Sequence, residues 1–420
     1  MKMSGCKRCE FKHAPAVVLC LLALCSAAQA EGNPYSLGAS VSLGSDDNLF
    51  RTAPGTEIRD RYATLSVFGG VDQSIGRQRL QANATLRRSQ FKECRELDNT
   101  GYNVKLGWNG ATEGDVSWDL SYETNRRLGS YGNIVASGPQ VANIETTDLA
   151  LAKLQLGLLA LWVADVTLSH RDIDDSAAAY AGDRLRVDAI GLGLTWNPLG
   201  PVSASIGPRY TRGHYPQART NADGSAEADD FVRQDIDFGL RWVASGASTL
   251  SARLSLTRQR ADRFRERDVD GATGQLGWRW DATGKTRFNA LLSRDTGSES
   301  SFFTQTVLGE SLRGSGDTSR LTNSASARID YEATGKISLS LSGQYAQRRL
   351  SATSQLADGT VISESGTDRR ASASLGARYA PTRNSVLGCG VGYERRGTRT
   401  TLSSAYRVNT VSCSAELSLR

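Results

Sequence analysis

The sequence predicts an all-β protein, a transmembrane antiparallel up-and-down β-barrel of about 18 strands. Three observations predict it. The chain opens with a segment typical of a signal peptide, short segments alternate apolar with polar side chains, and brief connections alternate with long polar ones. Alternation with period two is typical of strands whose two faces meet different surroundings. Together these features indicate a secreted chain that closes into a barrel in the bacterial outer membrane.

Residues 1–30 have the order of a secretory signal peptide: a basic start, an apolar stretch over 14–27, and the small residues of Ala28-Gln29-Ala30. The apolar stretch is too short for a membrane-spanning helix, which needs roughly 20 residues. We expect cleavage after Ala30, which leaves residues 31–420 as the barrel. Cleavage lowers the formal charge from +6 to +3, since four Lys or Arg and one acid are removed. The alternative is lipoprotein processing at Cys25.

Period two is clearest over residues 80–87, 116–123 and 250–257, where apolar side chains alternate with polar ones. An even number of strands is typical of single-chain bacterial barrels. The pattern predicts 18 strands, at residues 35–44, 62–73, 78–89, 100–109, 115–126, 145–156, 159–170, 184–196, 202–213, 231–242, 249–260, 269–280, 286–295, 320–331, 337–348, 369–379, 385–395 and 406–419.

The connections between these strands form two sets, as expected when all turns at one end of a barrel are brief and those at the other end are long. Short turns, which would face the periplasm, are predicted at residues 74–76, 197–201, 281–285, 332–336 and 380–384. Longer polar stretches, which would be extracellular loops, are predicted at residues 45–61, 127–144, 171–183, 214–230, 296–319 and 349–368.

All seven tryptophans fall at strand ends next to the short turns. Amphipathic rings favour the boundary between hydrocarbon and water. The sequence therefore predicts one periplasmic aromatic girdle, formed by Trp108, Trp118, Trp162, Trp196, Trp242, Trp278 and Trp280.

The polar phase of the strands predicts a hydrophilic interior, and barrels of about 16 to 18 strands leave room for an aqueous channel. After residue 30 the chain has 41 Arg and five Lys. Arginine binds carboxylates and other oxyanions with two parallel hydrogen bonds, so the wall would suit an acidic polysaccharide; the alternative is that these arginines pair with interior Asp and Glu. The predicted lumen-lining residues are Lys105, Asp119, Glu123, Asp235, Asp237, Arg253, Arg279, Arg328, Asp330, Arg370, Arg378, Glu394 and Glu416.

Two of the three cysteines after residue 30, Cys389 and Cys413, lie equally far from the middle of a hairpin predicted near Thr401. This spacing would place them opposite each other. In an oxidising compartment they would form a cross-strand disulfide; the alternative is two small apolar side chains facing lipid.

The sequence predicts no nucleic-acid binding, because the mild positive charge gathers in no basic cluster. It also predicts no enzyme and no cofactor, since few candidate catalytic residues remain after residue 30. His170 and His214 are the two histidines after residue 30, each beside a predicted loop. A Ser-His or Asp-His arrangement is the catalytic interpretation, and solvated loop histidines are the alternative. We predict no metal site, although calcium ligation is the alternative to solvation for the loop acids Asp172, Asp174, Asp175, Asp223, Asp229 and Asp230.

Two segments resemble a known family. Ser45-Asp46-Asp47-Asn48-Leu49-Phe50-Arg51 follows the first predicted strand, and Asn409-Thr410-Val411-Ser412-Cys413 lies in the last, which runs to Arg420. These segments look like the outer-membrane barrel family encoded in exopolysaccharide operons, often labelled EpsL. The resemblance implies a non-enzymatic part in exopolysaccharide biosynthesis and export. It also implies outer-membrane lipids, a polysaccharide substrate and a periplasmic polysaccharide-export protein as partners.

Three functions are therefore carried forward from the sequence. The first is a conduit, or outer-membrane partner, for exopolysaccharide export, in which weak repeated hydrogen bonds along the wall allow a polymer to pass. The second is a diffusion porin for small solutes. The third is a surface enzyme or adhesion module at the loops, and the fold alone does not separate the three.

Overall fold

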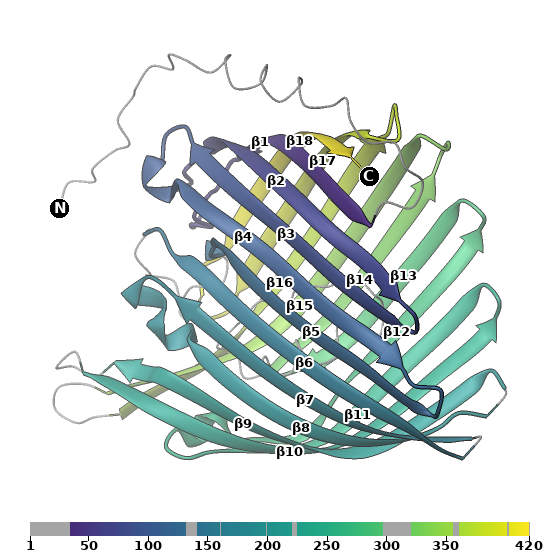
Figure 1. Cartoon of the computed structure of the whole chain (residues 1–420). Coiled ribbons are helices and arrows are strands. Elements are labelled where there is room, and N and C mark those ends of the chain that lie inside the picture. The colour runs from purple at the N-terminus through teal and green to yellow at the C-terminus, as the bar shows by residue number, and fades with distance from the viewer. Residues whose placement is uncertain are drawn as a thin grey trace.

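The computed structural model describes residues 34–131, 141–159, 161–198, 200–220, 225–296, 321–355, 361–400 and 403–419. Within these ranges the chain forms 18 antiparallel strands that close into one barrel, as predicted (Figure 1). The predicted signal peptide at residues 1–30, with the alternative processing site at Cys25, lies outside the described residues.

The barrel contains little besides strands and their connections. In the part of the chain that the structure describes, the connections contain three short 3-10 helices, η2 (Arg95–Leu97), η4 (Ala178–Asp183) and η5 (Arg265–Arg267). Within the described ranges, no helix has the length and apolar character needed to cross a membrane. The strands are β1 (Tyr35–Asp46), β2 (Asp60–Ile75), β3 (Gln78–Phe91), β4 (Asn99–Ala111), β5 (Val116–Leu128), β6 (Ile144–Leu159), β7 (Trp162–Asp175), β8 (Leu185–Trp196), β9 (Val202–Thr220), β10 (Ala226–Ser245), β11 (Ser248–Ala261), β12 (Val269–Thr283), β13 (Thr286–Asp295), β14 (Leu321–Glu332), β15 (Ile337–Gln355), β16 (Val361–Tyr379), β17 (Ser385–Thr398) and β18 (Tyr406–Leu419).

Closure joins the two ends of the chain. Each strand pairs with its neighbours in the sequence, and β1 also pairs with β18, from Leu37 opposite Leu419 to Asp46 opposite Thr410. An open sheet would leave a row of unpaired N–H and C=O groups along each edge. Pairing the first strand with the last satisfies these groups, so the sheet has no edge.

The two ends of the barrel differ, and we refer to them as the short-turn end and the loop end. Brief turns such as the one between β2 and β3 lie at the right of Figure 1, and longer connections lie at the left. Two predicted loops are wrong: residues 214–230 and 349–368 mostly belong to the long strands β9, β10, β15 and β16. Over these stretches the sequence does not alternate apolar with polar residues, so period two disappears although the backbone stays paired.

The outer face is apolar. Large exposed side chains such as Leu254, Leu256, Ile236 and Phe238 recur at every second position of the strands. The predicted girdle tryptophans lie on this face at the short-turn end, where Trp278 and Trp280 stack with ring centroids 5.6 Å apart. Such a face suits a surrounding apolar solvent and not water.

A disulfide bond joins Cys389 on β17 to Cys413 on β18, with an S–S distance of 2.18 Å. The two residues are directly opposite in the register, as the hairpin spacing predicts. Both share the strand phase of the exposed Val391 and Val411, so the disulfide lies on the outer face.

Replacing both cysteines by serine is expected to lower the free energy of unfolding by about 3 kcal/mol, because a cross-link between residues 24 apart restricts the unfolded chain. Urea unfolding of the barrel in lipid vesicles, with and without a reductant, measures the effect. Reductant should shift the unfolding midpoint of the natural chain and leave the double serine variant unchanged. Equal midpoints for both proteins without reductant would contradict the prediction.

Candidate functional site in the barrel interior

All of the predicted lumen-lining residues lie on the inward phase of their strands, opposite to the exposed apolar side chains. The structure pairs several of them. Lys105 Nζ lies 3.1 Å from Glu123 Oε2, and Arg370 Nη2 lies 2.7 Å from Glu394 Oε2. The described residues include no ion-pair partner for three others, Asp119, Arg378 and Glu416.

One wall of the interior, over β9 to β11, is filled by a buried ionic network. Arg233 Nη2 and Arg209 Nη2 lie 2.8 Å and 3.1 Å from the two carboxylate oxygens of Asp235, and the side chains of all three residues are almost fully buried. Arg209 also lies 3.0 Å from Asp237, which Arg253 approaches to 3.5 Å. The prediction that these residues line an open lumen is therefore wrong for Asp235, which has no exposed surface on its side chain.

The network extends to hydroxyl groups on the neighbouring strands. Thr257 Oγ1 donates to Asp235 Oδ1 at 2.6 Å, and Arg233 Nη1 donates to Thr296 Oγ1 at 2.6 Å. Thr296 directly follows β13, whereas Arg233 is on β10, three strands away around the barrel. Thr296 therefore turns towards the interior at the end of β13, where the long Arg233 side chain reaches it.

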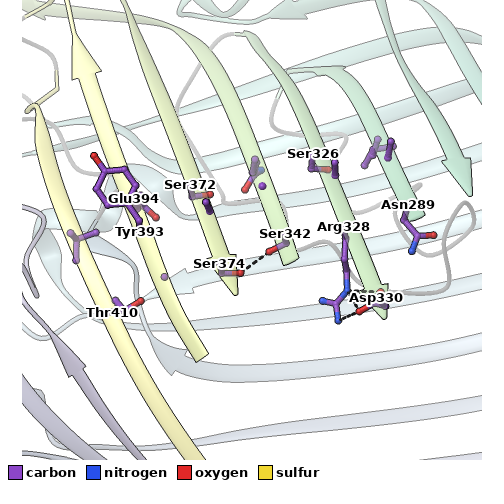
Figure 2. Close-up of a pocket in the computed structure, with 18 of the residues that line it drawn as sticks. Asn289, Ser326, Arg328, Asp330, Ser342, Ser372, Ser374, Tyr393, Glu394 and Thr410 are labelled. Atoms are coloured by element: carbon purple, nitrogen blue, oxygen red, sulfur yellow. Dashed lines mark hydrogen bonds and ion pairs between the residues drawn. The ribbon is translucent and has the colours of Figure 1, made fainter. Parts of the chain in front are cut away.

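The opposite wall, over β16 to β18, carries small side chains. Its inward positions include Ser372, Ser374, Gly390, Gly392 and Ser412, which leave space beside the backbone. A cavity of about 500 Å³ lies against this wall and extends across β14 to β13. Figure 2 shows the cavity, with an Arg328–Asp330 ion pair and a Ser342–Ser374 hydrogen bond on its strands. Small residues on one wall and a filled network on the other place the open space on one side of the interior.

The cavity carries more cationic than anionic groups. Four arginines, Arg51, Arg279, Arg287 and Arg328, line it together with the carboxylates of Asp330 and Glu394. Arg279 and Arg287 share one further carboxylate, that of Asp281, at 3.5 Å and 2.9 Å. Two guanidinium groups on one carboxylate leave a positive excess, which favours anions inside the barrel.

The loop end is narrowed by connections that fold inward. The loops after β1, β3, β5 and β7 pack together around a buried apolar cluster, here called the loop core. The inward-facing Phe91 belongs to it and Tyr62 of β2 packs against it, so the loop core rests on the inner wall. Burial raises the pKa of Tyr131 and of Tyr180, which keeps both phenols neutral. The buried members of the loop core are Leu49, Phe50, Phe91, Cys94, Leu97, Tyr131 and Tyr180.

The first loop is built by the segment that carries the family resemblance. Asn48 receives a hydrogen bond from the Thr52 amide and donates through Nδ2 to the carbonyls of Thr52 and Arg407. Arg51 has a φ of +57°, which costs energy for a residue with a side chain. Its Nη1 lies 2.6 Å from Asp46 Oδ2, and this contact holds the guanidinium at the cavity. The sequence motif thus forms an inward-folded loop that supplies one of the cavity arginines.

The two histidines His170 and His214 do not lie in the barrel interior. His170 Nδ1 is 2.7 Å from Asp188 and His214 Nδ1 is 2.8 Å from Asp230, and all four side chains are substantially exposed. They lie on the phase of the exposed Leu168, Ile190 and Tyr210, on the outer face. Among the described residues, no group of three or more His, Cys, Asp or Glu side chains is arranged to hold a metal ion.

The sequence alone did not predict the loop core or the inward turn at Thr296. The signal available for the loop core was the group of large apolar residues, such as Phe50 and Tyr131, within predicted polar loops. Apolar side chains in a loop indicate packing against something, but they do not identify the partner. For Thr296 we find no sequence signal.

No family model matches the chain, and no curated protein matches it. Among solved structures, the outer membrane protein OpdK from Pseudomonas aeruginosa is similar with 12% identity and a TM-score of 0.47, covering 92% of this chain and 99% of that one. OpdL from the same organism gives 12% identity and a TM-score of 0.44, with 93% and 99% covered. The FrpB iron transporter from Neisseria meningitidis gives 10% identity and a TM-score of 0.46, with 93% and 82% covered.

Proposed function

We propose that this protein is an outer-membrane β-barrel through which small hydrophilic solutes diffuse, with a preference for anions. The observation that carries the proposal is the arginine-rich cavity inside a closed barrel whose outer face is apolar. An apolar outer face and complete backbone pairing are what a lipid bilayer requires of a spanning sheet. A polar interior of 18 strands provides an aqueous path.

The interior supports passage of small solutes better than passage of a polymer. The loop core rests on the inner wall at the loop end and reduces the open width there. The buried ionic network fills the wall over β9 to β11, whereas the serine and glycine wall over β16 to β18 borders the cavity. Groups along this wall are weak, exchangeable partners, which suit transit and not tight binding.

Replacing Arg279 and Arg287 by glutamine is expected to reduce the anion preference of the pore, because Asp281 then stays without its two cationic partners. The measurement is the reversal potential in planar bilayers under a potassium chloride gradient. The natural protein should give an anion-selective potential, and the double variant should shift towards cation selectivity.

Arg294→Gln is the matched control, since this residue lies on β13 like Arg287 but is exposed on the opposite face. Its reversal potential should equal that of the natural protein. A natural protein that inserts into bilayers without conducting, or that selects cations, would overturn the proposed function.

The exopolysaccharide role implied by the sequence resemblance stays a prediction, together with its polysaccharide substrate and periplasmic export partner. Deleting the gene and measuring polymer separately in the medium and in the periplasm separates this role from solute diffusion. Polymer retained in the periplasm would favour export. Equal amounts with and without the gene would favour the diffusion pore.

A further inference from the structure

Five exposed arginines form a row on the outer face at the loop end, and we call this row the arginine arc. It comprises Arg349 on β15, Arg369 on β16, Arg395 on β17, Arg407 on β18 and Arg61 on β2. Because β18 pairs with β1 and β1 with β2, these strands are consecutive around the barrel. The arc therefore crosses the seam where the barrel closes.

Each arginine of the arc lies two to six residues from a large apolar side chain on the outer face of its strand, on the side towards the loop end. Those apolar residues are Tyr345, Leu375, Tyr393, Val411 and Leu65, all more than 40% exposed. Each has the same strand phase as its arginine, so the guanidinium groups share the outer face with the apolar band. The arc thus lies where an apolar band gives way to polar surface.

The arginines of the arc make no ion pair with any residue that the structure describes. Arg395 and Arg407 are directly opposite each other on β17 and β18. Like charges directly opposite on one face of a sheet destabilise it. The nearby carboxylate of Asp47 instead accepts hydrogen bonds from the backbone N and the Nδ2 of Asn409, both at 2.7 Å. The arc therefore carries positive charge that the described protein does not neutralise.

At the loop end of the outer face, the strands β7 to β12 differ from the arc in their charge pairing. On β7 to β12 two outward arginines have acidic partners: Arg186 lies 2.8 Å from Asp172, and Arg260 lies 2.6 Å from Asp270. Arg212 is directly opposite Asp188 in the register between β8 and β9. At the arc, five outward arginines on neighbouring strands lie without such a carboxylate, and this local excess of positive charge favours an external anion there.

We propose that the arginine arc binds the phosphate groups of anionic lipid headgroups in the surrounding membrane leaflet. Guanidinium groups form paired hydrogen bonds with phosphate, and a headgroup lies where the apolar band ends. A phosphate between Arg395 and Arg407 converts a repulsive pair into two attractive contacts. The proposal rests on the membrane placement given above, because it takes its ligand from the bilayer.

The test compares binding of bis-phosphorylated lipid A with that of the same lipid without phosphates, to the purified barrel in a non-ionic detergent, by native mass spectrometry. Replacing both Arg395 and Arg407 by glutamine is expected to weaken binding of bis-phosphorylated lipid A about tenfold or more. The paired-side variant carrying Arg186→Gln and Arg260→Gln is the matched control, because both arginines already have carboxylate partners, and its affinity should equal that of the natural protein.

Three results would overturn the proposal: unchanged affinity in the arc variant, equal binding of the lipid without phosphates, or displacement of the lipid by inorganic phosphate at similar concentration. The last would indicate a site for free phosphate. Bilayer conductance is measured on the same preparations. A barrel that conducts but does not bind the phosphorylated lipid refutes this inference alone, whereas one that fails to conduct refutes the proposed function.

Discussion

Replacing Asp235 by asparagine is expected to lower the free energy of unfolding by about 3–5 kcal/mol, the usual cost of breaking a buried ion pair on one side. Asp235 accepts contacts from Arg233, Arg209 and Thr257, and its side chain is fully buried. Without the carboxylate, the positive charges of two buried guanidinium groups have less negative charge beside them to compensate their loss of hydration. Urea unfolding in lipid vesicles, together with the temperature at which the folded band is lost on electrophoresis, measures the loss.

Asp330→Asn is the matched control for this change. Asp330 pairs with Arg328 two residues before it on β14, as Asp235 pairs with Arg233 on β10. The pair on β14 is partly exposed to the interior, with 45% and 31% of the two side chains accessible. Exposed ion pairs contribute about 0–1 kcal/mol to the free energy of unfolding, so this substitution should have a small effect. If the two substitutions lower the free energy of unfolding equally, burial of the ion pair does not determine the loss, and the prediction is contradicted.

Replacing both Phe50 and Tyr131 by alanine is expected to raise the single-channel conductance severalfold. Their rings meet in the loop core with centroids 4.9 Å apart at an interplanar angle of 66°. Truncating a buried Phe costs about 3–5 kcal/mol in a packed core. A small cluster shared by four loops has few other apolar contacts to offset this loss, so the loops should release from the inner wall and widen the loop end.

Single-channel recordings in planar bilayers provide the measurement. Tyr345→Ala serves as the control, since it removes a comparable aromatic ring that is exposed on the outer face. Its conductance should equal that of the natural protein. If the double variant also keeps the natural conductance, the loop core does not restrict the pore.

The strands were predictable because period two is a local property of the sequence. Over residues 250–257 the alternation gives both the strand and the phase that faces inward, and β11 spans Ser248–Ala261. The pattern failed where its physical cause was missing. The sequence of the extensions of β15 and β16 does not alternate apolar with polar residues, so no period marks these paired stretches.

By itself the sequence determined the class of fold, the number of strands, the inward face on which the predicted lumen-lining residues lie and the end at which the tryptophans gather. These depend on neighbours in the chain and on the hairpin turns between them. It also brought Cys389 and Cys413 together, because a hairpin fixes its register locally.

Only the tertiary structure decided which interior charges are buried, where the loops fold, and which outward arginines lack a carboxylate. Asp235 and Asp330 have the same sequence surroundings, an arginine two residues before them, yet only Asp235 is fully buried. The difference comes from Arg209 on the adjacent strand and from Thr296 three strands away. Such contacts depend on closure and on the shape of the interior, and no periodicity along one strand records them.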